Sequence, residues 1–313
     1  MDPKLHPTQL YSGRCAVVTG ASKGIGLEIV RRLAGEEGMT VVLTARDVKR
    51  GREAVAFSTI RVSTTCCFID WTFENRRTWK PSPDSSEIGS GHPVIKKHMY
   101  WVNNAGVSGV WVDVAGLKAL NIDPESWLSG KATDSVKGII RQSYEDAKQC
   151  LDTNFYGCRR VTEALLPLLK LSPSARIVNV SSLRSELKRI PNEGIRCEFG
   201  DLEGLDEAKI DSLLGRFLKD LEAGELEKGR WPRMLPAYSM SKVALNAYTR
   251  VLARRHPGMC INCVHPGYVN TDINWHTGFL TIEEGARGPV MLSLLSDDGP
   301  SGKYFDQTVV SEF

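Results

Sequence analysis

The stretch RCAVVTGASKGIGLEIVRRLAGEEGMTVVLTA, residues 14–45, decides the fold class of this chain. Residues 14–19 and 40–45 are short apolar runs that predict buried strands, and residues 27–35 place apolar side chains at helical spacing. A glycine-rich turn, residues 20–26, joins the first strand to the helix. Strand, helix and strand in this order form a βαβ unit, whose two strands run parallel in one sheet.

The rest of the chain continues the alternation of strands and helices. Further strands are predicted at residues 99–102, 176–180 and 259–264, and helices at residues 143–170 and 238–256. We therefore expect an α/β fold in which one Rossmann-type, doubly wound parallel sheet forms a single domain over residues 1–313.

The composition argues against several classes of protein. The chain has 40 basic and 37 acidic residues, and a net charge of +3 does not indicate a nucleic-acid or membrane partner. No run approaches the roughly 18 apolar residues of a membrane span, and the first ten residues lack the apolar run of a secretory signal. We expect a cytoplasmic protein.

The eight cysteines are scattered, which favours reduced thiols over a disulfide framework. Cys260 and Cys263 form a lone CxxC inside a predicted strand, where residues three apart point to opposite faces. We interpret them as buried strand residues, with a metal or redox pair as the alternative. The histidines show no ligand spacing, so no metal is expected.

The glycine-rich turn has the surroundings of a dinucleotide-binding site. It follows a strand and opens a helix, so its backbone can approach a pyrophosphate while the helix N-terminus faces the phosphates. Its spacing is G-x3-G-x-G rather than G-x-G-x-x-G, and an ordinary strand-to-helix turn is the alternative. The candidate cofactor-binding residues here are Gly20, Ser22, Lys23, Gly24, Ile25 and Gly26.

The end of the second predicted strand favours NADP(H). An NAD site usually has an acid there to hold the ribose hydroxyls, but this chain has Ala45 followed by Arg46. Arg46 and Lys23 together can neutralise a 2′-phosphate, unless both are solvated surface bases. Asp47 is an acid near the same position and keeps NAD(H) open as an alternative.

Five further motifs follow the turn in a fixed order. They are Asn103-Asn104-Ala105-Gly106, Asn154 in LDTNFYG, Ser182 at the end of IVNVSS, Tyr238-x3-Lys242, and Pro266-Gly267 after CINCV. Each alone is a weak signal, but the ordered set resembles the short-chain dehydrogenase/reductase family over residues 14–56 and 99–306. The resemblance implies an oxidoreductase that binds a nicotinamide cofactor.

The spacing of Tyr238 and Lys242 has a physical reason, because residues i and i+4 share one helix face and can act on one pocket. A free phenol titrates near 10, and a nearby ammonium is expected to lower its pKa. The resemblance implies that Tyr238 protonates a carbonyl oxygen and that Lys242 also holds the nicotinamide ribose. It implies that Ser182 hydrogen-bonds the substrate oxygen and that Asn154 positions a water in the proton relay.

The resemblance assigns further positions around this catalytic set. Its remaining cofactor-binding candidates are Asp70 at the adenine, Asn104, Ala105 and Gly106 near the adenosine, and Pro266, Gly267, Val269 and Thr271 at the nicotinamide carboxamide. Trp231, Met234 and Leu235 precede Tyr238 and are candidates for an apolar substrate wall. Ordinary packing of these three side chains is the alternative.

Tyr238 follows Ser182 by 56 positions, and the residues between them, 183–237, form a long insertion. Such a gap is similar to the monomeric carbonyl-reductase branch of the family, in particular its plant salutaridine and menthone-type reductases. Residues 206–222 predict an amphipathic helix with apolar positions at Ile210, Leu213, Leu214, Phe217 and Leu221. We expect this helix to cover the surface that relatives use for association, which predicts a monomer.

Residues 71–98 depart from the family pattern, because prolines and glycines stand where relatives have an amphipathic helix. One hypothesis is that this segment is non-native coding sequence, and the alternative is a divergent lineage. Its disruption leaves open, as the alternative function, a cofactor-binding or catalytically impaired isoform.

The complete catalytic set favours an NADPH-dependent oxidoreductase that reduces a ketone or aldehyde to an alcohol. The resemblance implies a small-molecule carbonyl substrate of terpenoid, alkaloid or quinone type, and the pocket decides among these.

Overall fold

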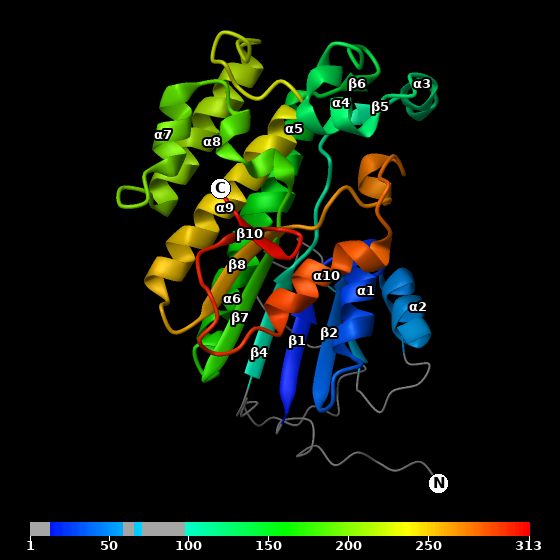
Figure 1. Ribbon diagram of the computed structural model, residues 1–313, viewed down its shortest axis with the longest axis vertical. Helices are drawn as coiled ribbons and strands as arrows, with labels where there is room; N and C mark the ends of the chain where they lie inside the picture. Colours follow the sequence, from blue (N-terminus) through cyan, green and yellow to red (C-terminus); the bar gives the residue numbers. More distant parts are fainter. Residues whose placement is uncertain (1–12, 59–65, 71–97) are drawn as a thin grey trace.

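The computed structural model describes residues 13–58, 66–70 and 98–313 (Figure 1). The atypical segment predicted at 71–98 lies outside the described residues, except for His98.

The described residues form a main sheet of eight strands in the order β10-β9-β8-β7-β4-β1-β2-β3. The strands are β1 (Arg14–Val18), β2 (Met39–Ala45), β3 (Cys66–Asp70), β4 (His98–Asn103), β7 (Ser174–Val180), β8 (Cys260–His265), β9 (Tyr304–Asp306) and β10 (Val309–Ser311). All neighbouring pairs are parallel except β9 and β10. The strand order reverses between β1 and β4, which is the switch point where open α/β sheets bind ligands.

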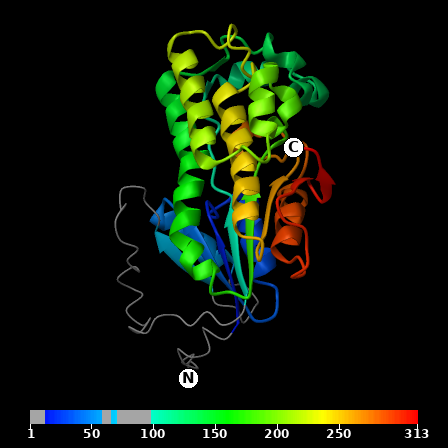
Figure 2. The ribbon, with the colours of Figure 1, turned by 90° about the vertical axis from the view of Figure 1, so that its left-hand side faces the viewer.

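Helices cover both faces of this sheet and bury two separate apolar cores (Figures 1 and 2). One face carries α1 (Gly24–Leu33), α2 (Val48–Ser58) and α10 (Ile282–Ser293), and the other carries α5 (Tyr144–Leu151), α6 (Cys158–Leu169) and α9 (Pro236–Arg255). Trp101, Phe155 and Tyr248 are fully buried in the second core. This arrangement confirms the predicted Rossmann-type α/β fold.

Two additions lie beyond the carboxyl ends of the strands (Figure 1). The inserted residues 183–237 contain α7 (Glu193–Gly200) and α8 (Glu207–Glu222). A small lobe consists of β5 (Trp111–Val112), α3 (Val114–Ala119), α4 (Pro124–Ser129) and β6 (Ile140–Arg141). Its apolar cluster includes Trp127 from α4 together with Met234 and Tyr268 from distant segments, so the lobe is joined to the main body.

Two helix predictions differ from the structure in an informative way. Helix α1 begins at Gly24, so Gly24 and Gly26 belong to its first turn rather than to a preceding loop. The predicted helix 143–170 is interrupted by a π-helical turn, Asp152–Gly157, which contains Asn154. π-Helical turns inside α-helices are frequent at functional sites. Helices α2, α7 and α10 and the small lobe were not predicted.

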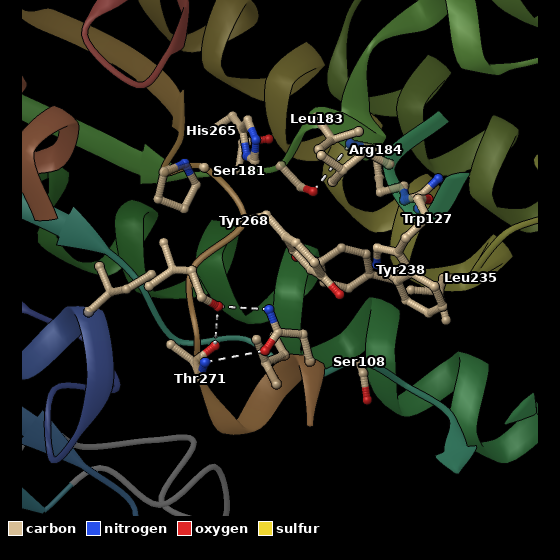
Figure 3. A pocket seen from close by; sticks show the side chains of 18 of the residues that line it. Ser108, Trp127, Ser181, Leu183, Arg184, Leu235, Tyr238, His265, Tyr268 and Thr271 are labelled. Atoms are coloured by element: carbon tan, nitrogen blue, oxygen red, sulfur yellow. Dashed lines mark hydrogen bonds between the residues drawn. The ribbon is translucent and has the colours of Figure 1, made fainter. Parts of the chain in front are cut away.

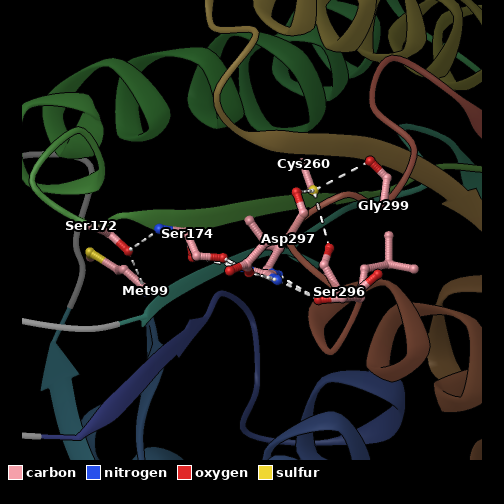
Figure 4. A network of polar contacts seen from close by, with 9 residues as sticks. Met99, Ser172, Ser174, Cys260, Ser296, Asp297 and Gly299 are labelled. Carbon is pink, nitrogen blue, oxygen red and sulfur yellow. Dashed lines mark hydrogen bonds and ion pairs between the residues drawn. The ribbon is translucent and has the colours of Figure 1, made fainter.

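A buried arginine ties the amino end of β7 to the segment after α10. Arg176 is 3% exposed, and its guanidinium donates to the backbone oxygen of Leu295 (3.0 Å) and to the Asp297 carboxylate (2.8 Å). The Cys260 thiol donates to the backbone oxygen of Ser296 at 3.7 Å (Figure 4). Cys260 and Cys263 are both buried in β8, as predicted.

Within the described ranges, no helix is long and apolar enough to cross a membrane. The same residues contain no group of three or more histidine, cysteine or acidic side chains that could hold a metal ion.

Candidate active site

The glycine-rich turn is packed so tightly that side chains are excluded at two positions. Gly20 has a φ of +62°, and a Cβ there would lie 2.8 Å from the Cα of Ala105. A Cβ on Gly26 would lie 2.4 Å from the amide nitrogen of Asn104. In contrast, a Cβ on Gly24 would meet only the Thr271 side chain, at 3.8 Å, so the space over the start of α1 is open.

Helix α1 presents an uncompensated N-terminus to this open space. No side chain caps it, and its first turn has no acidic residue. Its N–H groups and the helix dipole therefore suit a pyrophosphate, and the residues here fit the dinucleotide that the sequence predicts.

Asn104 fixes the glycine-rich turn against the end of β4. Its side-chain amide donates to the backbone oxygens of Thr19 (3.0 Å) and Gly20 (3.2 Å), and the Thr19 hydroxyl accepts from the N–H groups of Asn104 and Ala105. Ala105 and Gly106 follow directly, and a Cβ on Gly106 would lie 3.7 Å from the Lys242 nitrogen. The absence of a side chain at Gly106 therefore keeps the approach to Lys242 open.

The two basic side chains predicted to bind a 2′-phosphate have different surroundings in the structure. Arg46 is exposed directly after β2. Lys23 is ion-paired with Asp272, which lies beyond β8. Asp47 is already hydrogen-bonded within the protein. Its carboxylate accepts from the Arg50 backbone N–H (3.0 Å) and so caps α2.

Asp70 is the last residue of β3, and its backbone pairs with Ala45 at the end of β2. Its side chain lies outside the described residues.

Tyr238 and Lys242 lie one turn apart on α9, as their spacing predicts. The Lys242 nitrogen is 5.7 Å from the centre of the Tyr238 ring and donates to the backbone oxygen of Val180 at 2.8 Å. Lys242 is 4% exposed, and burial lowers its pKa to about 8. The group is therefore still largely a cation at pH 7.

The pKa of Tyr238 moves in the opposite direction to the prediction. Burial raises it to about 12, although the Ser182 hydroxyl and the Arg184 guanidinium act to lower it. The physical reason is that the desolvation of a phenolate is less favourable than its stabilisation by these two neighbours is favourable. In the protein without cofactor, Tyr238 is a protonated phenol at neutral pH.

Ser182 lies two residues after the end of β7, and it lines one pocket together with Tyr238 (Figure 3). Its hydroxyl oxygen accepts from the Arg184 backbone N–H at 3.2 Å. The hydroxyl proton therefore points away from that N–H and faces the Tyr238 oxygen, where a substrate oxygen would compete for it.

Asn154 uses its whole side chain inside the protein. Its oxygen accepts from the Val107 N–H (2.8 Å), and its nitrogen donates to the Val107 oxygen (2.9 Å) and to the Ser241 hydroxyl (3.0 Å). Asn154 thus joins the π-helical turn to α9 and to the segment after β4. Ser241 lies within the Tyr238-x3-Lys242 motif, but no sequence pattern indicates this contact.

The loop after β8 and the insertion complete the pocket. Pro266, Gly267, Val269 and Thr271 line it, together with Ile25 of the glycine-rich turn. Leu235 also lines it, but Trp231 does not, because its indole packs on Phe217 of α8 and donates to Asp220 at 2.8 Å. Met234 is buried in the cluster of the small lobe.

Several residues that line the pocket were not predicted from the sequence. They are Trp127 and Leu128 from the small lobe, Arg184, Tyr268 and Trp275. Figure 3 shows Trp127, Tyr268 and Leu235 grouped around Tyr238. The wall of the pocket is therefore largely aromatic and apolar.

A Rossmann-type sheet, a tight glycine turn and a Tyr/Lys pair beside a serine define a nicotinamide-dependent oxidoreductase. A sequence model described as short chain dehydrogenase matches residues 14–84. Short-chain dehydrogenase/reductase 1 of Saponaria officinalis is 45% identical and covers 97% of both chains. (+)-Neomenthol dehydrogenase of Arabidopsis thaliana is 42% identical over 96% of this chain and 98% of its own. Carbonyl reductase (NADPH) 3 of Rattus norvegicus is 33% identical over 95% of this chain and 97% of its own.

The solved structure of salutaridine reductase from Papaver somniferum has the same architecture. It is 40% identical, with a TM-score of 0.80 over 94% of this chain and 99% of that one. The chain therefore belongs to the short-chain dehydrogenase/reductase family. It is an oxidoreductase of the carbonyl reductase type.

Proposed function

We propose that the protein reduces a ketone or aldehyde of a terpenoid-, alkaloid- or quinone-like molecule to the alcohol, with NADPH as the cofactor. The observation that carries this is one pocket lined by Ser182, Tyr238, the Pro266–Gly267 loop and Ile25 of the glycine-rich turn. A carbonyl compound in this pocket lies between the proton donors of the protein and the predicted nicotinamide position.

The charges near the end of β2 support NADP(H) over NAD(H). Arg46 is exposed where a 2′-phosphate would lie, and the nearby acid Asp47 is occupied as the cap of α2. An acid that is already hydrogen-bonded is poorly placed to hold ribose hydroxyls. The printed name of the rat relative also includes NADPH.

The side chains divide the work of carbonyl reduction. The Ser182 hydroxyl and the Tyr238 phenol bind the carbonyl oxygen, and Tyr238 donates its proton to that oxygen as negative charge develops. The Lys242 ammonium favours the phenolate that results and orients the cofactor ribose. The bound nicotinamide supplies the hydride. Asn154 holds the surrounding segments in place.

The test is the variant Tyr238→Phe, assayed as NADPH consumption with a panel of cyclic ketones. Loss of the general acid is expected to lower turnover by at least about 100-fold, because such catalysis contributes about 10² to 10⁴. NADPH binding, followed by cofactor fluorescence, should be nearly unchanged. Near wild-type turnover would remove Tyr238 from the mechanism, and absence of NADPH binding by the wild type would favour the impaired isoform.

We also propose that the protein is a monomer, because α8 covers α5 and α9. The predicted stripe of α8 is buried at Ile210, Leu213, Leu214 and Phe217. Arg159 of α6 also pairs with Asp211 of α8 at 2.8 Å.

A further inference from the structure

Arg184 is a buried cation in the wall of the substrate pocket. It lies two residues after Ser182 and is 7% exposed. Its guanidinium donates to the backbone oxygen of Trp127 at 2.5 Å, which draws α4 of the small lobe against the catalytic segment. Figure 3 shows Arg184 beside Trp127, on the same side of the pocket as Tyr238.

Arg184 lacks the counter-charge that other arginines of this chain have. Arg189, five residues further, pairs with Glu186 at 2.9 Å, and the buried Arg176 pairs with Asp297. Among the described residues, no carboxylate pairs with Arg184, and its charged neighbour Arg189 carries the same sign. Burial lowers the pKa of Arg184 to about 10, so it stays charged at neutral pH.

A buried charge without a partner is costly, and it persists where a bound group supplies the missing partner. A guanidinium has five N–H donors in a planar fork, and one acceptor of the protein leaves most of this fork unused. A carboxylate matches the fork with two parallel, charge-assisted hydrogen bonds. Much of the rest of the wall, including Trp127, Leu235 and Trp275, is apolar or aromatic and suits a carbon skeleton.

We propose that Arg184 binds a carboxylate of the substrate, so that the preferred substrate is an oxo acid: a cyclic ketone or aldehyde with a carboxylate on its skeleton. This deepens the proposed function and rests on it. The carboxylate at Arg184 anchors the molecule, and the apolar wall then directs its carbonyl carbon toward the cofactor side of Tyr238.

The first experiment compares matched substrates. The purified full-length protein is assayed with NADPH on 3-oxocyclohexanecarboxylate and on its methyl ester. A charge-assisted pair is expected to raise kcat/KM for the acid over the ester by about 10- to 150-fold. In Arg184→Gln this preference should vanish, because kcat/KM for the acid falls much further than kcat/KM for the ester. Equal activity on acid and ester in the wild type would overturn the proposal.

The matched control is Lys188→Gln, which removes the same charge from an exposed position of the same segment. It should leave the preference intact. If Lys188→Gln and Arg184→Gln have equal effects, the preference reflects the overall field and the proposal fails.

A binding measurement separates this inference from the proposed function. Cyclohexanecarboxylate and cyclohexanemethanol, which cannot be reduced, are titrated by calorimetry into wild type and Arg184→Gln. Selective binding of the carboxylate that is lost in the variant supports the anion site, even if no ketone is reduced. Equal binding of the two compounds overturns it.

Thermal unfolding of Arg184→Met tests whether Arg184 has only a structural role. Removing a buried, unpaired charge should leave the melting temperature unchanged or raise it. A marked fall in melting temperature, with equal loss of activity on acid and ester, would show that Arg184 only supports the fold.

Discussion

Tyr238 and Lys242 show how burial changes the chemistry of single residues. Their spacing predicts a pair on one helix face, and the structure places the ammonium 5.7 Å from the ring centre. Burial raises the pKa of the phenol to about 12 and lowers that of the ammonium to about 8. Over the physiological range both groups keep their protons, which is the state that carbonyl reduction needs.

The first prediction concerns pH. Lys242 is charged below pH 8 and neutral above it, so kcat for reduction is expected to fall as pH rises through about 8. Between pH 8 and the ordinary lysine value, the unfolded chain binds more protons at this site than the folded chain does. The contribution of Lys242 to the free energy of unfolding therefore rises with pH, so the titration of Lys242 does not itself destabilise the fold.

Stopped-flow turnover from pH 6 to 9.5, with circular dichroism at each pH, measures this. Lys242→Arg keeps its charge over the whole range, so its residual activity should lack the fall near pH 8. The same fall in the variant would assign the titration to another group.

The second prediction concerns cofactor choice. Arg46→Ala is expected to weaken NADPH binding by about 10- to 150-fold relative to NADH, because only NADPH offers a 2′-phosphate to the guanidinium. Lys49→Ala, also exposed and three residues further, is the control for lost surface charge. Fluorescence titration measures the dissociation constants of both cofactors. An equal loss of affinity for NADPH and NADH would show that Arg46 does not determine the preference for NADPH.

At the scale of elements, α8 shows how an insertion becomes part of the core. Its apolar stripe predicts one buried face, and Phe217 meets the Trp231 ring edge-on, with ring centres 5.4 Å apart. The opposite face of α8 is polar, and Ser212 is exposed on it. The helix therefore stabilises the fold chiefly through the apolar contacts of one face.

The third prediction tests this packing. Leu213→Ala removes a fully buried side chain and is expected to lower the free energy of unfolding by about 2–5 kcal/mol. Ser212→Ala, one residue earlier on the exposed face, should change it by less than about 0.5 kcal/mol. Urea denaturation followed by circular dichroism measures both values. Similar small effects would mean that α8 is only loosely attached.

At the scale of the whole molecule, the insertion bears on association. Helices α5 and α9 lie next to the active site, and α8 covers them. A surface that is already buried within one chain is not available to a second copy.

The fourth prediction is that light scattering at micromolar concentration gives the mass of one chain. The measured molecular mass should not change on dilution, because no association equilibrium is expected. A mass near two or four times that of one chain would show that the insertion does not prevent association.

Features that depend on local pattern can be predicted from the sequence. The βαβ unit follows from apolar periodicity over residues 14–45, and the placement of Tyr238 above Lys242 follows from the helical repeat. The buried stripe of α8 is likewise a matter of spacing within one segment. Such signals can be read from the chain because the residues that cooperate are close in sequence.

Features that depend on distant segments and on burial become visible in the folded chain and not in the sequence. The Asp47 carboxylate caps α2, and Trp127 lines the pocket although it lies more than fifty residues before Ser182. The raised pKa of Tyr238 and the unpaired charge of Arg184 both arise because folding removes these groups from water. Desolvation depends on everything packed around a group, and no short stretch of sequence contains that information.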